Sequence, residues 1–353
     1  MSCPAMADGA AAPSAQAPAR RRARPLARRT AVAVAVIAAL LAAVCASLAL
    51  GTLKLPLRDV IDVLLGRDGA DPLAREVILQ LRLPRTAAAI LVGAALGVAG
   101  ALLQGALGNP LASPDVIGVT GGAAFGAMLV ILLVPGRVAL LPLAAMGCGL
   151  IAVALAVAIA WTGVNRGSIS RLILAGIAVG AIFTAGTGML MALYPSRVPS
   201  AVMWLTGGLT SDGWTTIRAV APYVVAGLVL AVMFVRPLNR LALGDDVAAS
   251  LGTHPRLVRL GAIAVAAVLA AGSAALAGLL TFVGIVVPHA VRMMGGTHGH
   301  AYVIPVSALA GAALVTAGDV VARTIKAPIE LPVGPIMVAI GVPLFLWLMR
   351  KNV

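Results

Sequence analysis

The sequence predicts an all-α polytopic membrane protein with about ten transmembrane helices, and two observations lead to this fold class. Hydrophobic residues make up 61% of the 353 residues and charged residues only 11%, a balance that would leave a soluble domain apolar over almost its whole surface. The apolar residues also recur in runs of roughly 20, the length that a helix needs to cross a bilayer, and short stretches with Gly, Pro and basic residues separate these runs.

The basic excess fits a membrane protein better than a nucleic-acid-binding one. The formal net charge is +14, but Lys and Arg gather at the ends of apolar segments and no aromatic residues are interleaved with them. Such residues orient membrane segments and contact anionic lipid, so we expect lipid and no nucleic acid as a partner. The three cysteines lack metal-like or paired spacing, and Cys45 and Cys148 are expected to be small core residues.

The N-terminal residues 1–30 are rich in Ala, Pro and Arg, and we expect a disordered, basic cytoplasmic N-terminus there. The apolar run 31–50 follows. It lacks a convincing small-x-small cleavage site and is too long for an ordinary signal-peptide core, so a retained first span is favoured over a signal peptide. Residues 31–350 then form one transmembrane domain, and 51–76 form an amphipathic connection with a short surface helix.

The stretch from Arg82 to Gly118 contains a complete bilayer crossing. Arg82-Leu83-Pro84-Arg85 precedes an apolar run, 86–107, that ends where Pro110 and Pro114 forbid a continuous helix. From Arg85 to Asn109 is 24 positions, or ~36 Å of helix, enough to cross a ~30 Å core. Small residues recur at every fourth position, which lets another helix approach closely. They are Gly93, Gly97, Ala101 and Gly105.

The other crossings follow from the same apolar pattern. With the two described above, the expected spans are 31–50, 86–107, 116–134, 140–162, 172–193, 217–235, 260–280, 282–294, 302–321 and 333–349. Ser113-Pro114-Asp115 is a candidate N-cap for the third span. The eighth is only about half a span long and contains Pro288.

An even number of crossings places both termini on one side, and the positive-inside rule makes that side the cytoplasm. Most loop arginines then face inward. Arg82 and Arg85 fall on the opposite, outer side, against the rule, and require another explanation.

No source of energy or catalytic apparatus is visible in the chain. A G-x-x-x-x-G-K-[ST] phosphate loop is absent, His-Glu-x-x-His is absent, and Asp319 and Arg323 are the ionisable residues that come nearest to the interior of a span. His298 and His300 form a His-x-His pair without a third ligand, which favours a solvated loop over a metal site.

The connection 239–259 is the place where a partner could attach. Residues 243–252 form a predicted short helix between Gly244 and Gly252, with Asp245 or Asp246 as its cap. Leu243, Val247 and Leu251 are four residues apart and share one apolar face. This face fits either a groove in a soluble partner or the membrane surface, and the residues alone do not separate the two.

These motifs, taken together and in order over about residues 50–350, resemble the FecCD-type permease subunits of type II ATP-binding-cassette (ABC) importers, which take up iron–siderophores, haem and vitamin B12. The resemblance is carried by Leu81–Arg85, Leu103-Gln104, Asn109–Ala112 with Pro114, Leu172–Gly176, Trp204–Gly208, Leu243–Asp246, Leu251-Gly252, Phe282–His289 with Arg292, and Glu330–Gly334.

The resemblance implies a type II ABC importer permease fold and roles for particular residues. Arg82, Arg85 and Arg323 match positions that dock a periplasmic or lipoprotein substrate-binding protein. Asn109, Leu111 and Ser170 match a cytoplasmic gate, although the bulky Ile169 beside Ser170 departs from a relative with a hydroxyl there. Segment 295–300 departs from the usual Gly-x-Asp-His-Arg pattern. The residues that match the helix coupling the permease to the ATPase are Leu243, Gly244, Asp245, Asp246, Val247, Leu251 and Gly252.

The resemblance also implies the function. Two permease subunits, identical or related, would enclose a pathway above two ATPase subunits, which would carry ATP and Mg; this chain would bind no cofactor and no metal and would not be an enzyme. We expect a ferric siderophore as cargo, with haem or vitamin B12 as the alternative. A self-energised secondary carrier and an integral membrane enzyme are the rival classes.

Overall fold

The protein is described by a computed structural model for residues 19–51, 56–67, 71–162, 168–209 and 213–350. These residues form a bundle of helices without strands. Within these described ranges, seven helices are long and apolar enough to span a membrane and three further apolar helices are shorter, so the prediction of about ten transmembrane helices is confirmed.

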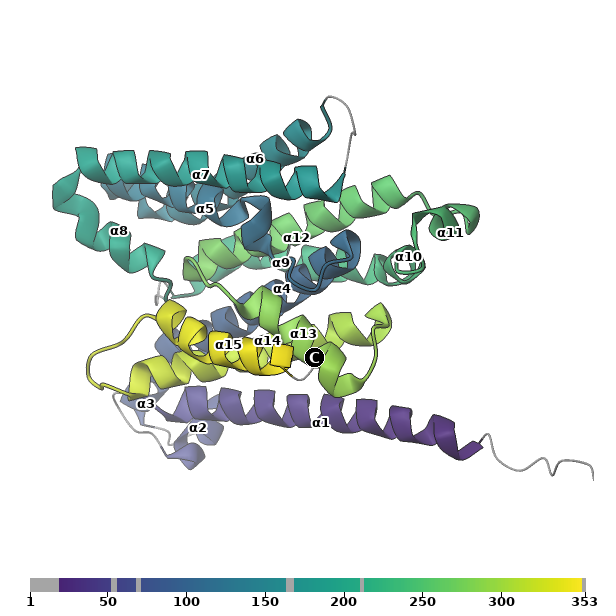
Figure 1. The fold of residues 1–353 in the computed structure, drawn as a ribbon. Helices are drawn as coiled ribbons and strands as arrows, with labels where there is room; N and C mark the ends of the chain where they lie inside the picture. The colour runs from purple at the N-terminus through teal and green to yellow at the C-terminus, as the bar shows by residue number, and fades with distance from the viewer. Residues whose placement is uncertain (1–18, 52–55, 68–70, 163–167, 210–212, 351–353) are drawn as a thin grey trace, which may run out of the picture.

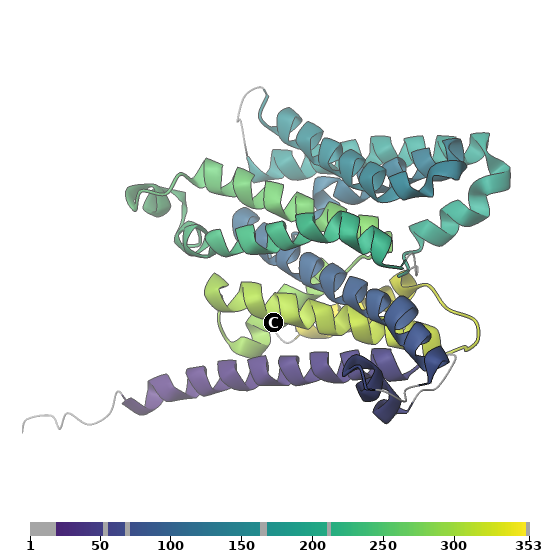
Figure 2. The ribbon, with the colours of Figure 1, turned by 180° about the vertical axis from the view of Figure 1, so that it is seen from behind.

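The long helices lie roughly side by side across the bundle (Figures 1 and 2). They are α1 (Ala19–Ala49), α4 (Leu83–Leu107), α6 (Leu141–Ala160), α7 (Ile169–Leu193), α9 (Gly213–Met233), α12 (Pro255–Ala277) and α14 (His300–Thr324). The shorter apolar helices are α5 (Val119–Met128), α13 (Val283–Gly295) and α15 (Val333–Arg350).

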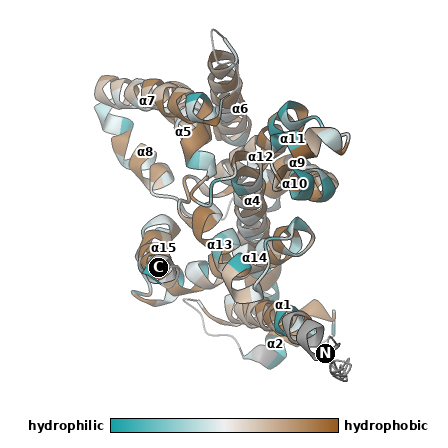
Figure 3. Ribbon diagram, turned by 45° about the vertical axis from the view of Figure 1, so that its right-hand side comes forward, coloured by the Kyte–Doolittle hydropathy of each residue, from teal (hydrophilic) through white to brown (hydrophobic). Residues whose placement is uncertain are grey.

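The bundle has two ends, which carry different small elements (Figures 1 and 2). The start of α1 lies at the same end as α10 (Val235–Leu241) and α11 (Asp245–Ser250), which we call the α11 end. At the opposite, α3 end lie α2 (Leu57–Leu64), α3 (Pro72–Glu76) and α8 (Val198–Leu205). Hydrophilic residues gather on α10 and α11, whereas the long helices are mostly apolar (Figure 3).

Two local expectations are corrected by the structure. α1 begins at Ala19, so residues 19–30, which were expected to be disordered, are helical; residues 1–18 lie outside the described part. Ser113 makes no side-chain cap, because a short 3₁₀ helix, Pro114–Ile117, comes first. Gly118 then adopts a left-handed conformation, and α5 begins at Val119 instead of residue 116.

The predicted stripe of small residues packs against α14, and this contact brings the two backbones together. A Cβ added at Gly93 would lie 2.2 Å from the carbonyl oxygen of Gly311, and one added at Gly97 would lie 2.2 Å from that of Ser307. One added at Gly105 would lie 2.4 Å from Nε2 of His300. The stripe therefore follows α14 along most of its length, and glycine is needed because no side chain fits between the helices.

The half-length span arises from a backbone break between α12 and α13. Gly278 ends α12 with φ of 66°, and Phe282 precedes α13 with φ of 68°, a left-handed value that is uncommon for a residue with a side chain. The three positions between them turn the chain inside the bundle, so α13 begins there instead of at a surface.

Replacing Gly93 with alanine tests the close contact between α4 and α14. The added methyl group would overlap the Gly311 carbonyl, and overpacking of this kind costs about 1–3 kcal/mol. We expect G93A to lower the melting temperature of the purified protein in nanodiscs.

Gly147 on α6 is the matched control, because nothing lies within 4 Å of a Cβ added there. G147A should leave the melting temperature unchanged or raise it slightly, since alanine favours helix over glycine. Equal melting of G93A and the wild type would contradict the described packing.

Candidate transport site

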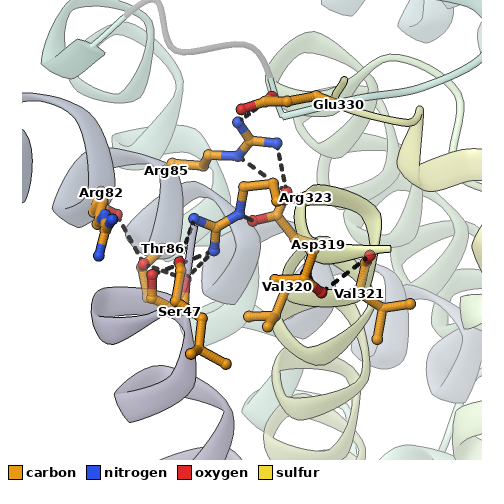
Figure 4. Close-up of polar contacts among 11 residues, drawn as sticks. Ser47, Arg82, Arg85, Thr86, Asp319, Val320, Val321, Arg323 and Glu330 are labelled. Carbon is orange, nitrogen blue, oxygen red and sulfur yellow. Dashed lines mark hydrogen bonds and ion pairs between the residues drawn. The ribbon is translucent and has the colours of Figure 1, made fainter. Parts of the chain in front are cut away.

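Charged residues gather at the α3 end, where α1, α4 and α14 meet (Figure 4). We call Arg82, Arg85, Asp319, Arg323 and Glu330 the arginine cluster. Arg85 contacts Asp319 through Nε at 3.0 Å and Nη2 at 2.9 Å, and it contacts Glu330 through Nη1 at 2.7 Å. Arg323 approaches the other oxygen of Asp319 with its Nε at 3.0 Å. Asp319 is fully buried and lies between two guanidinium groups, which compensate its charge.

Arg82 and Arg323 also bind backbone carbonyl groups at the end of α1. The last carbonyl groups of a helix have no partner within the helix. Arg82 donates from Nη1 to the carbonyl oxygens of Leu48 at 2.6 Å and Ala49 at 3.0 Å. Arg323 donates to the carbonyl of Ser47 at 3.3 Å and to its hydroxyl at 2.9 Å. Positive charge at a helix C-terminus also suits the helix dipole.

Burial of these side chains differs from what the docking role led us to expect. Arg82 and Arg323 are each only 5% exposed, so they do not stand on the surface as an open docking patch. Arg85 is 11% exposed, while its partner Glu330 is 50% exposed. The structure thus brings the three expected arginines together but gives them internal partners, and Glu330 is the member of the cluster most open to the exterior.

The predicted gate residues lie at the turn after α4 and at the start of α7. Asn109 accepts a hydrogen bond from the Leu111 amide at 2.9 Å, which closes a local turn, and Leu111 is 47% exposed. Ser170 is exposed in the first turn of α7. Further along α7, a Cβ added at Gly176 would lie 2.4 Å from the carbonyl oxygen of Val116, so α7 packs tightly against the segment that follows the turn.

The predicted coupling residues form an exposed apolar face on and beside α11. Leu243 is 62% exposed, Val247 46% and Leu251 51%. The expected cap is corrected, because Gly244 occupies the N-cap position and neither aspartate caps the helix. Asp245 instead binds Arg259 through two hydrogen bonds of 2.7 Å.

Several polar contacts at the α11 end were not identified from the sequence. His300 is buried, and its backbone amide and Nδ1 contact Oδ1 of Asn239 at 2.9 and 2.8 Å, so the solvated-loop interpretation holds only for the exposed His298. Arg292 donates to Oε1 of Gln104. Among the described residues, no group of three or more His, Cys, Asp or Glu side chains is arranged to hold a metal.

The contacts within the arginine cluster and at the α11 end were missed for different reasons. Asp319 and Arg323 are four residues apart on an apolar helix, a spacing that could have identified them as a buried pair. Asn239, Arg259 and Glu330 carry no such local signal, because their partners are far away in the sequence.

A cavity of about 440 Å³ lies beside Arg85, between α4, α8, α9 and α12. Its lining is mostly apolar, and its charged residues are Arg85 and Arg197. An apolar space with so few charged groups offers little for tight recognition of a polar ligand.

The fold and the site define a multi-pass membrane protein of the transport type, and comparison with known proteins specifies the kind. The model of the FecCD transport family matches residues 39–351. The Fe(3+)-citrate import permease YfmE of Bacillus subtilis is 37% identical, over 86% of this chain and 90% of its own length. The Fe(3+) dicitrate transport permease FecD of Escherichia coli is 39% identical, over 78% of this chain and 85% of its own.

A solved structure of an inward-facing ABC transporter of the metal-chelate type superposes with a TM-score of 0.81 at 29% identity, covering 91% of this chain and 99% of the other. The chain therefore belongs to the FecCD transport family. This is a family of ABC importer permeases, whose members are translocation subunits.

Substitution of Asp319 by asparagine tests the architecture of the arginine cluster. Removing one member of a buried ion pair leaves uncompensated charge and costs about 3–5 kcal/mol. We expect D319N to lower the melting temperature and the yield of folded protein sharply.

The matched control is D62N, which removes a carboxylate from pairs with Arg58 and Arg67, whose side chains are 89% and 63% exposed. Exposed pairs contribute about 0–1 kcal/mol, so D62N should melt within a few degrees of the wild type. If D319N is no less stable than D62N, the buried pairing is wrong.

Proposed function

We propose that this chain is the translocation subunit of an ATP-driven importer that moves a ferric siderophore across the bacterial cytoplasmic membrane. The observation that carries the proposal is the exposed apolar face of Leu243, Val247 and Leu251, in a chain whose sequence contains no phosphate-binding loop. An exposed apolar patch marks either a protein contact or a membrane contact, and we take this one as the contact with a separate ATPase. The α11 end then faces the cytoplasm and an ATPase subunit that carries ATP and Mg.

The α3 end then faces outward and receives the substrate-binding protein. Arg82 and Arg323 shape this surface from within, because Arg82 fixes the end of α1 against the start of α4 and Arg323 fixes it against α14. Arg85 would contact the substrate-binding protein directly. Glu330 occupies one edge of its guanidinium and is half exposed, so a carboxylate of the binding protein can replace Glu330 there. This exchange keeps Arg85 paired before and after docking.

The gate residues Asn109, Leu111 and Ser170 would close the cytoplasmic exit. Leu111 and Ser170 are exposed, and they would meet their counterparts in a second permease subunit, identical or related. ATP-driven movement of the ATPase subunits acts on α11 and resets this gate. The mostly apolar cavity beside Arg85 supports a pathway of low affinity, with specificity in the binding protein.

The cargo assignment rests on motif similarity. We interpret Asn109–Val116 and Trp204–Gly208 as resembling the motifs of ferric-siderophore permeases more than those of haem or vitamin B12 permeases. Family membership alone does not separate these cargoes, because the resemblance covers all three. Uptake of labelled cargo in a strain that lacks this gene decides among them.

We expect such a strain to lose uptake of a ferric siderophore and to keep uptake of haem and vitamin B12, with recovery when the gene is restored. Siderophores of the citrate, hydroxamate and catecholate classes are compared in parallel, each as the ⁵⁵Fe complex. If the strain lost only the uptake of haem or of vitamin B12, that compound, and not a ferric siderophore, would be the cargo. Normal uptake of every compound would contradict an import function for iron chelates.

A charge on the coupling face tests the contact with the ATPase. V247D places a carboxylate in the apolar face, which must then be desolvated on docking, at a cost of several kcal/mol. We expect the ATPase subunit to be lost when V247D is purified by an affinity tag on the permease.

V247I is the control, because it keeps the position apolar and should retain the ATPase. The melting temperature of V247D alone should equal that of the wild type, since the side chain is exposed. Retention of the ATPase by V247D would rule out this face as the docking surface.

A further inference from the structure

The last turn of α4 contains a carbonyl group that the helix itself cannot satisfy. In an α-helix the carbonyl of residue 106 accepts from the N–H of residue 110. α4 ends at Leu107, so the Ala106 oxygen is one of the last carbonyl oxygens of the helix, which have no helical donor, and Pro110 has no N–H to offer in its place. This oxygen lies just before Gly108, the left-handed residue that ends α4 and opens the turn with Asn109 and Leu111.

Arg259, in the first turns of α12, supplies the missing donor. Its Nε donates to the Ala106 oxygen at 3.1 Å. The remaining nitrogens of the same guanidinium group donate to the two carboxylate oxygens of Asp245, each at 2.7 Å. The planar guanidinium group of Arg259 thus binds the end of α4 with one edge and the first residue of α11 with the other. Lysine cannot reproduce this geometry, because it needs three N–H donors held in one plane.

We propose that Arg259 is the positioning residue that transmits movement of the coupling helix α11 to the gate turn, residues 108–113. This inference rests on the proposed function, because it takes α11 as the element that the ATPase moves. Displacement of α11 carries Asp245, the bidentate pair carries the guanidinium with it, and the Ala106 carbonyl follows. One path from α11 to the gate turn then runs through two side chains, those of Asp245 and Arg259.

The far side of α11 is held as well, so the helix moves as a unit. Nη1 of Arg240 donates to the Thr253 hydroxyl at 3.2 Å and lies 3.4 Å from the Leu251 oxygen. The helix is therefore fixed at its start by Arg259 and beyond its end by Arg240. Because both ends of α11 are held, a force on its exposed apolar face displaces the whole six-residue helix instead of unwinding its ends.

The energetics suit a transmitting contact better than a stabilising one. Asp245 is 51% exposed and Arg259 19% exposed, and pairs so open to solvent contribute only about 0–1 kcal/mol to stability. Variants at these two positions are therefore expected to fold. The pair of Asp245 and Arg259 contributes little to stability but strongly constrains how α11 and α12 are oriented. A bidentate arginine–carboxylate pair fixes orientation as well as distance.

The primary test compares R259Q with R256Q in the complex with ATPase and binding protein in liposomes. Arg256 lies one turn earlier on α12, over the ring of Trp161, so it controls for loss of a positive charge at this end. We expect R259Q to retain the ATPase and to hydrolyse ATP, but to move about tenfold less cargo per ATP, equivalent to ~1.4 kcal/mol of lost coupling.

R256Q should keep the wild-type ratio of transport to hydrolysis. A ratio for R259Q equal to that of R256Q would overturn the proposal. Loss of the ATPase from R259Q would overturn it too, because Arg259 would then shape the docking surface instead of transmitting its movement.

A second measurement needs no ATPase and so separates this inference from the proposed function. Amide hydrogen exchange of residues 107–112 is followed in the full-length chain in nanodiscs. R259Q should speed exchange there by about fivefold, the factor expected for loss of one hydrogen bond of ~1 kcal/mol. D245N, which alters only the α11 side of the contact, should speed it in the same direction, and R256Q should not.

Unchanged exchange in both R259Q and D245N would overturn the link even if import of a ferric chelate is established. The charge-swapped double variant D245R/R259D adds a final distinction. It restores an ion pair between α11 and α12 but gives the Ala106 carbonyl no donor from position 259. Transport per ATP should stay low in this variant, and its recovery would show that the ion pair alone matters.

Discussion

The direct contact between the backbones of α4 and α14 is the constraint on which the rest of the structure depends. It exists because Gly93 and Gly97 present no side chain to the Gly311 and Ser307 carbonyls. In a bilayer, helix association has little hydrophobic driving force, so close van der Waals approach of this kind takes its place. The contact between α4 and α14 also sets which residues meet at the two ends of these helices. At the α3 end it brings Arg85 to Asp319, and at the α11 end it brings Gly105 to His300.

Polar groups inside this bundle are placed where the helices leave backbone groups unsatisfied. Arg82 and Arg323 bind the last carbonyls of α1, and Arg259 binds the carbonyl of Ala106 that Pro110 leaves open. Unsatisfied groups are costly away from water, so each arginine has a structural reason for its position. The same contacts join separate helices, and this makes them suited to carry movement between elements. If the proposed function holds, structural and functional roles coincide in these side chains.

The apolar pattern of the sequence was enough to predict the helices, including the half-length α13, because each crossing must satisfy its backbone internally and so appears as a continuous apolar run. The small-residue stripe predicted a close contact, although not its partner α14. Burial of Arg82 could not be predicted, since it depends on the end of α1, more than thirty residues away. The contact from Arg259 to Ala106 joins residues 153 positions apart, and only Pro110 hinted that a donor was needed.

The central claim is that this polypeptide is a passive conduit whose movement is driven by a separate ATPase. Reconstitution of the purified chain in liposomes, with and without its ATPase and binding protein, tests this most directly, using accumulation of ⁵⁵Fe-siderophore as the readout. We expect uphill accumulation only when both partners and ATP are present, and none with the chain alone under an imposed proton or sodium gradient. Uphill accumulation by the chain alone on such a gradient would contradict the central claim.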